Sequence, residues 1–173
     1  TFAQANLMKC YYEKQDFVNS EIYADKVLKN PKMDDKIKSD AQIIIARSAI
    51  KTNNDAKAKE AYAKLQKIAK GELAAEALYY DAYFKNKEAK FEASNKAVEK
   101  YSSTYSGYKY FGAKSLVVMA KNYYGLKDSF QATEILQSII DNFTEFPDVV
   151  TECQTELDKI KAEEAKTNSS VTK

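Results

Sequence analysis

The chain has no histidine and no tryptophan, and only one of its 27 basic residues, Arg47, is an arginine. Without histidine, neither a Ser-His-Asp nor a Cys-His catalytic arrangement can form, and imidazole cannot ligate a metal. Arginine is the side chain that grips phosphates and guanines through paired hydrogen bonds. Its scarcity, with a net charge of only +2, argues against specific nucleic-acid binding. We therefore expect no enzymatic activity, no metal and no nucleic-acid partner.

Chain breakers and long apolar runs are also scarce. Two prolines and four glycines in 173 residues favour long helices joined by short loops over turn-rich β folds. The longest aliphatic run, residues 43–46, is far shorter than the roughly 20 residues that span a bilayer, so we expect no transmembrane segment. Residues 107–115 resemble a phosphate-binding loop, but Ala113 separates Gly112 from Lys114, so we expect no nucleotide cofactor. Cys10 and Cys153 lie near opposite ends of the chain, and we expect two free thiols.

What the chain does have is an internal repeat. Helix-like stretches open at Phe17, Ala56, Phe91 and Phe130, at intervals of 39, 35 and 39 residues (56−17, 91−56, 130−91). Such a period indicates a row of helical hairpins, each burying its apolar faces against its neighbours. We expect Phe130 to bridge neighbouring repeats, so that its replacement by alanine would cost about 3–5 kcal/mol.

The pattern places one helical repeat domain over residues 1–166. The expected repeats are 1–31, 34–71, 72–107 and 108–145, followed by a helix over 147–166. That last helix has a single narrow apolar stripe on an otherwise polar surface, which suits the end of a stack, so we expect it to cap the array. Residues 167–173 are short and polar and are expected to be disordered. The apolar pattern begins directly at residue 2, which leads us to expect further repeats upstream in the native chain.

The hairpins resemble tetratricopeptide repeats (TPRs). The first repeat carries Tyr11, Gln15-Asp16-Phe17 at the turn, and Ala24; the position of the family's glycine is assigned to Met8, Arg47 and Ala120. The resemblance implies an all-α, right-handed α-solenoid of about four antiparallel helix pairs plus the C-terminal capping helix. The lysine- and tyrosine-rich hairpins and the charged ending resemble the C-terminal part of large bacterial cell-envelope repeat proteins. This second likeness implies a periplasmic or envelope location, with the cytoplasm as the alternative.

The TPR resemblance also implies protein or peptide binding, because the first helix of each pair lines the concave groove in that family. The residues carried over to the groove are Lys9, Tyr12, Val117, Lys121 and Tyr124. Lysines beside tyrosines can hold an acidic or carboxyl-terminal peptide. The alternative is a solvated lysine face over structural aromatics.

A second set of candidates follows from composition, since tyrosine is enriched at interfaces. Tyr105, Tyr108 and Tyr110 lie around the expected loop of the third repeat. Two functions remain open: a non-enzymatic scaffold that binds a protein or peptide in its groove, or a structural spacer without a peptide ligand.

Overall fold

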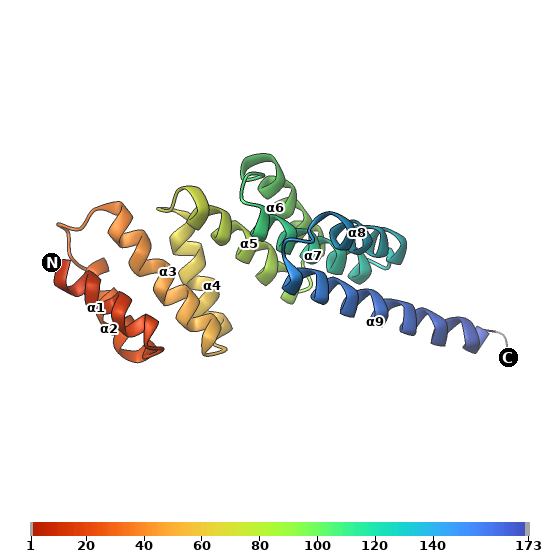
Figure 1. Cartoon of the computed structure of the whole chain (residues 1–173), viewed down its shortest axis with the longest axis horizontal. Coiled ribbons are helices and arrows are strands. Elements are labelled where there is room, and N and C mark those ends of the chain that lie inside the picture. The colour runs from red at the N-terminus through yellow and green to blue at the C-terminus, as the bar shows by residue number, and fades with distance from the viewer. Residues whose placement is uncertain (1, 172–173) are drawn as a thin grey trace. The chain divides into compact units, whose positions relative to one another are not determined.

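The computed structural model describes residues 2–171, and within that range the chain consists of nine helices and no strand (Figure 1). The helices are α1 (Phe2–Glu13), α2 (Phe17–Leu28), α3 (Asp35–Lys51), α4 (Asp55–Gln66), α5 (Gly71–Lys87), α6 (Phe91–Thr104), α7 (Lys109–Gly125), α8 (Ser129–Asn142) and α9 (Pro147–Val171). The predicted all-α class is confirmed, and the helices fall into four consecutive pairs followed by α9. We call α1, α3, α5 and α7 the first helices and α2, α4, α6 and α8 the second helices.

The chain forms two compact units, Thr1–Asp81 and Ala82–Lys173, with the boundary inside α5. In the first unit α1 packs on α2, α2 on α3 and α3 on α4. In the second unit α6 packs on α7, α7 on α8 and α8 on α9. Helices two apart along the chain also touch, since α1 contacts α3 and α7 contacts α9. Contacts between consecutive helices are typical of a helical solenoid, while the predicted handedness of a superhelix stays a prediction.

The two helices of each pair are joined by the same turn. Its central residue has a positive φ: Gln15 (60°), Asn53 (55°), Ala89 (57°) and Lys127 (67°). In the third hairpin the N–H of Ala89 donates to the carbonyl of Asn86 (2.9 Å), and the N–H of Lys90 to that of Lys85 (2.9 Å). These two bonds form a Schellman motif, which satisfies carbonyls at the helix end.

The residue after each positive-φ residue immediately precedes the second helix, in the N-cap position. In three hairpins its side chain accepts a hydrogen bond from an N–H three residues later: Asp16 from Asn19, Asn54 from Lys57, and Asp128 from Gln131. These are N-caps. Lys90 occupies the same position in the third hairpin without a side-chain cap.

The positive-φ residues define the repeat period as 38, 36 and 38 residues (53−15, 89−53, 127−89). Seven residues before each of them lie Met8, Ala46, Ala82 and Ala120, all fully buried. These four residues are equivalent, so the residue of the second repeat that corresponds to Met8 and Ala120 is Ala46. The assignment to Arg47 was wrong by one residue.

The same period corrects the prediction for Phe130. Two residues after the positive-φ position lie Phe17, Asp55, Phe91 and Ser129. Phe130 is one residue further on and is equivalent to Val18; their exposed fractions are 72% and 71%. Phe130 therefore faces water, and the expectation that it bridges repeats was wrong.

Phe91 is the aromatic residue that joins one hairpin to the next. Its ring lies on Gly125 at the end of α7, where an added Cβ would come within 2.5 Å of the ring. A glycine is therefore required at Gly125 for this contact to form.

Helix α9 extends to Val171, beyond the expected end at residue 166. The stretch from Lys161 to Asn168 has no glycine or proline and is rich in alanine, glutamate and lysine, which favour helix. The expected disordered tail was therefore wrong for residues 167–171, and its last two residues lie outside the described range. The predicted apolar stripe of α9 is confirmed, because its residues are all buried: Val149, Cys153, Leu157 and Ile160.

Candidate partner-binding faces of the first helices

The first unit places two of the predicted groove residues, Lys9 and Tyr12, near charged groups of neighbouring first helices. The Lys9 ammonium lies 2.7 Å from the carboxylate of Asp40 on α3, and the Lys9 side chain remains 51% exposed. Burial raises the pKa of Tyr12, with the charge of Arg47 lowering it and that of Glu76 raising it. Asp40 also lines a surface hollow together with Lys36, Lys70 and Leu73.

Next to this face lies a buried carboxylate, Glu76 on α5, whose side chain is 3% exposed. The guanidinium of Arg47 donates to it from Nε (3.0 Å to Oε1) and from a terminal nitrogen (2.5 Å to Oε2). The hydroxyl of Tyr62 donates to the same carboxylate (2.9 Å). A buried charge is stable only when it is paired and hydrogen-bonded, and Glu76 has three donors.

The pKa values of Arg47 and Tyr62, which both donate to Glu76, are shifted by this arrangement. The hydrogen bonds to Glu76 raise the pKa of Arg47 above its ordinary value, although burial acts in the opposite direction. Burial is the main cause that raises the pKa of Tyr62, and the charge of Glu76 adds to it. The ring of Tyr62 also stacks on Tyr80, with centroids 4.0 Å apart. The sole arginine of the chain is thus part of a structural pair.

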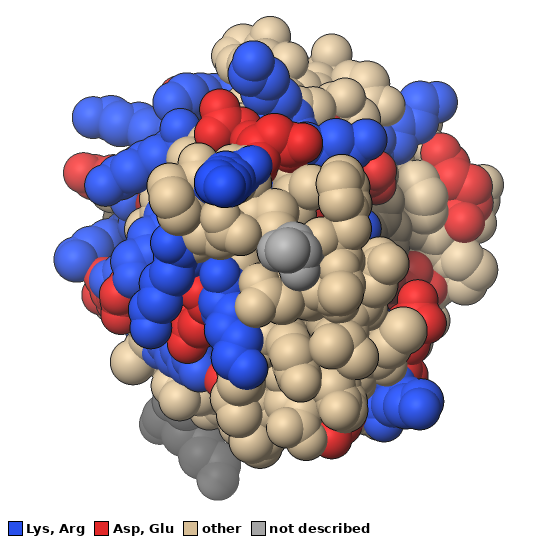
Figure 2. All heavy atoms as spheres, turned by 90° about the vertical axis from the view of Figure 1, so that its left-hand side faces the viewer, with Lys and Arg blue, Asp and Glu red and all other residues tan. Residues whose placement is uncertain are grey.

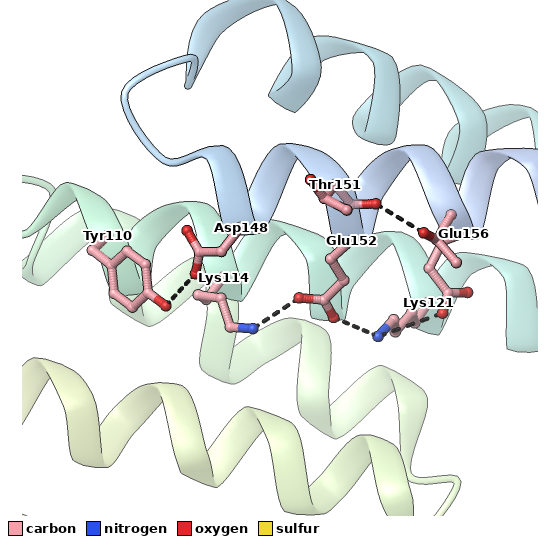
Figure 3. Close-up of polar contacts among 8 residues, drawn as sticks. Tyr110, Lys114, Lys121, Asp148, Thr151, Glu152 and Glu156 are labelled. Atoms are coloured by element: carbon pink, nitrogen blue, oxygen red, sulfur yellow. Dashed lines mark hydrogen bonds and ion pairs between the residues drawn. The ribbon is translucent and has the colours of Figure 1, made fainter.

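The second unit contains an ion-pair network between α7 and α9 (Figure 3). The carboxylate of Glu152 accepts from Lys114 and from Lys121, at 2.8 Å each. Lys121 also lies 3.7 Å from Glu156. The TPR resemblance implied that Lys121 lines the concave groove. Its ammonium is instead paired with carboxylates of α9.

The pKa values of this network reflect competition between burial and charge. Burial raises the pKa of Glu152, but the hydrogen bonds and charges of Lys114 and Lys121 lower it more, so its pKa lies below the ordinary value. Burial likewise lowers the pKa of Lys121, but Glu152 and Glu156 raise it to a net value above the ordinary one.

Two further predicted residues, Tyr110 and Tyr124, contact α9 through their hydroxyls. Tyr110 donates to Asp148 (2.7 Å) and Tyr124 donates to Glu163. The ring of Tyr110 also meets Phe146 edge to face, with centroids 5.4 Å apart. Val117 is buried in the core that joins α7 and α8 to α9. Binding of a partner at Val117 would therefore require α9 to move.

Tyr105 and Tyr108 lie around the turn between α6 and α7. The Tyr105 ring contacts the rings of Tyr101 and Tyr108, and the hydroxyl of Tyr101 donates to the carbonyl of Tyr108 (2.7 Å). Tyr101 is buried, whereas Tyr108 is exposed. Of these three tyrosines, Tyr101 is therefore part of the core and Tyr108 is accessible to a partner.

A regular spacing relates the ion pairs between first helices. Lys9 pairs with Asp40, Arg47 with Glu76, and Lys121 with Glu152, at separations of 31, 29 and 31 residues. Each cation lies six residues before its positive-φ turn. Glu152 stands at the place equivalent to Asp40 and Glu76, so α9 packs as a fifth first helix. These acids were not predicted from the sequence: the separations of 29 to 31 residues are nearly regular, but which residues pair depends on how the hairpins stack.

Comparison with other proteins adds no family. Models of known protein families do not match the chain, and curated protein sequences show no significant match to it. Over residues 2–171, no helix has the length and apolar character that crossing a membrane requires. In the same range, no three potential Cys, Asp or Glu ligands gather into a cation-binding group.

Proposed function

We propose that this chain is a non-enzymatic interaction scaffold of the tetratricopeptide type, which binds a protein or peptide along its first helices. The observation that carries the proposal is the half-exposed side chain of Lys9, whose ammonium reaches Asp40 at a surface hollow. An exposed ion pair contributes little to stability, about 0–1 kcal/mol, so a ligand carboxylate can replace Asp40 as the partner of Lys9. The partner is an acidic segment or a carboxyl terminus, with Tyr12 as an apolar contact.

The chosen test compares binding by the natural chain and by Lys9→Glu. A library of acidic peptides with free carboxyl termini is titrated against each protein by calorimetry. The substitution should weaken binding about tenfold or more, because it replaces a charge-assisted hydrogen bond by repulsion. It should change the free energy of unfolding by less than about 1 kcal/mol. Lys96→Glu, on an exposed position of α6, is the matched control and should bind like the natural chain.

Lys121→Glu is not a clean probe of binding, because Lys121 joins α7 to Glu152 and Glu156 of α9. Its reversal should reduce stability whether or not a ligand exists. Equal binding by the natural chain and Lys9→Glu would contradict the proposed site.

The second candidate function is a structural spacer that positions other domains without a peptide ligand. The ion pairs between α7 and α9 favour a spacer, because they leave fewer cations for a ligand. They join Lys114 and Lys121 to Glu152, and Lys121 to Glu156. Absence of binding to any library member would support the spacer. For either function we place the protein in the periplasm or envelope of a bacterium, with the cytoplasm as the alternative. Fractionation of the native cells distinguishes these compartments.

A further inference from the structure

A small hollow lies in the first unit where α2, α3 and α4 meet. Its volume is about 160 Å³, and Gln42 of α3 lines it together with residues of α2 and α4. A single water molecule needs about 10–15 Å³ of such space, so the hollow admits a group the size of a side chain. It is distinct from the hollow at Asp40, which is lined by α3 and α5.

Gln42 brings an unpaired hydrogen-bond acceptor to this hollow. Its side chain is only 5% exposed, and its Nε2 donates to the carbonyl of Ala61 (3.2 Å). Because a carbonyl only accepts, this bond fixes the orientation of the amide and leaves Oε1 as the remaining polar atom. Within residues 2–171 no donor is bonded to Oε1, and the protein does not fully enclose that atom. A ligand at Gln42 must therefore be a hydrogen-bond donor.

The fold does not require a polar side chain at this position. Gln42 lies eleven residues before Asn53 (53−42), and the equivalent residues of α5 and α7 are Leu78 (89−11) and Leu116 (127−11). In α1 the equivalent residue is Gln4 (15−11), which is less buried. Burying an amide whose carbonyl has no partner costs free energy. A ligand explains the glutamine of α3 better than packing does.

The charges around the hollow leave one carboxylate without a lysine. Lys57 pairs with Glu21, and the Lys64 ammonium lies 2.6 Å from the Glu60 carboxylate. Asp25 lines the same hollow, and no lysine of the described residues forms an ion pair with it. Lysines and acids lie next to one another at several places on the N-terminal side of the protein (Figure 2), whereas at this hollow one acid is left over. The site therefore favours a ligand with one positive charge.

The rest of the lining is apolar and consists of Leu28, Ile45 and Ala61. These side chains can contact the methylene groups of an alkyl arm. We propose that the hollow binds a primary alkylammonium group, which donates hydrogen bonds to Oε1 of Gln42 and to the carboxylate of Asp25. A lysine side chain of a partner protein and a free alkylamine share this chemistry.

The test titrates the full chain, labelled with nitrogen-15, with pentylammonium chloride. NMR signals of the Gln42 side-chain amide and of the Ala61 backbone amide are followed, and both should shift saturably in the millimolar range, as expected for a ligand this small. Pentanol has the same alkyl chain without the charge and should bind at least about tenfold more weakly. Nα-acetyl-lysine amide is titrated in parallel, to represent a lysine within a protein chain.

Two variants locate the binding. Gln42→Leu introduces the residue found at this position in α5 and α7, and loss of the acceptor should weaken pentylammonium binding about tenfold or more, judged from the Ala61 amide. Asp25→Asn removes the charge from an exposed side chain and should weaken binding about threefold or more, without a change in the urea midpoint. Glu99→Gln changes the residue of α6 equivalent to Asp25 (99−89 and 25−15) and should bind like the natural chain.

Absence of a saturable shift with pentylammonium would overturn the proposal, since the hollow would then hold water alone. Equal affinity for pentanol would overturn it too, as would unchanged pentylammonium binding by Asp25→Asn and Gln42→Leu. Matching shifts with Nα-acetyl-lysine amide would assign the site to a lysine of a partner protein, and shifts with pentylammonium alone would assign it to a free alkylamine. None of these outcomes depends on the proposed binding of an acidic segment at Lys9.

Discussion

Individual side chains in this protein are best understood from their distance to the positive-φ turn of their hairpin. Aromatic residues near the start of the second helices looked alike in the sequence, yet Phe91 covers Gly125 while Phe130 is exposed. A shift of one residue along a helix rotates a side chain by about 100°, which separates an inward position from an outward one. Aligning the repeats by their aromatic residues therefore gave the wrong register for Phe130, whereas aligning them by the positive-φ turn gives the correct one.

Replacement of Phe130 by alanine should have a small effect. Because the ring is 72% exposed, we expect Phe130→Ala to lower the free energy of unfolding by less than about 1 kcal/mol. Leu136→Ala in the same helix removes a buried side chain and should cost about 2–5 kcal/mol. Urea unfolding of both variants makes the comparison, and a larger loss for Phe130→Ala would contradict the period of 38, 36 and 38 residues.

The pair of Arg47 and Glu76 should respond unequally to removal of either partner. Arg47→Leu leaves a buried carboxylate with the Tyr62 hydroxyl as its remaining donor of the three, and should cost about 3 kcal/mol. Glu76→Gln leaves Arg47, whose side chain is partly exposed and can turn to water, so a loss of about 1 kcal/mol is expected. Denaturant midpoints of the two variants measure the difference. A larger cost for Glu76→Gln would mean that the guanidinium, rather than the carboxylate, is the buried charge.

At the scale of elements, helix boundaries were readable from sequence because few residue types can end a helix. The predicted openings at Phe17 and Phe91 match the starts of α2 and α6, and the predicted start at residue 147 matches that of α9. The ion pairs between helices were not predicted, since they join residues about 30 positions apart and depend on how the hairpins stack. The end of α9 was also missed, because a polar composition does not distinguish an exposed helix from a disordered tail.

The turn at Ala89 offers a stabilising substitution. A non-glycine residue with positive φ costs about 1–2 kcal/mol, and glycine adopts this conformation readily. We therefore expect Ala89→Gly to raise the free energy of unfolding by about 0.5–1 kcal/mol. Ala93→Gly, inside α6, should lower it by a similar amount. Thermal unfolding checks both signs, and a loss of stability in Ala89→Gly would contradict the turn geometry.

The contact between α7 and α9 should weaken in acid. The lowered pKa of Glu152 means that its contribution is present above the unfolded pKa of about 4.3 and is lost as the pH falls through the lower folded value. Glu152→Gln should cost about 1 kcal/mol at pH 7 and little at pH 2. Unfolding at a series of pH values, with the exposed Glu134→Gln of α8 as control, measures this difference. A cost for Glu152→Gln that is the same at both pH values would exclude the ion pairs as its cause.

As a whole, the described part of the chain contains four α-hairpins, which turn at Gln15, Asn53, Ala89 and Lys127. Its fold class and repeat number followed from sequence because helical periodicity and turns are local properties. The face available to a partner did not, because Val117 and Lys121 became inaccessible or paired only when α9 packed on α7.

The most direct test is assignment of the backbone chemical shifts of the full chain by NMR. The account predicts helical Cα and Cβ shifts over the nine helices, interrupted at those four residues by shifts and scalar couplings of the positive-φ region. Extended-strand shifts within the helices, or an unbroken helix through Ala89, would contradict it.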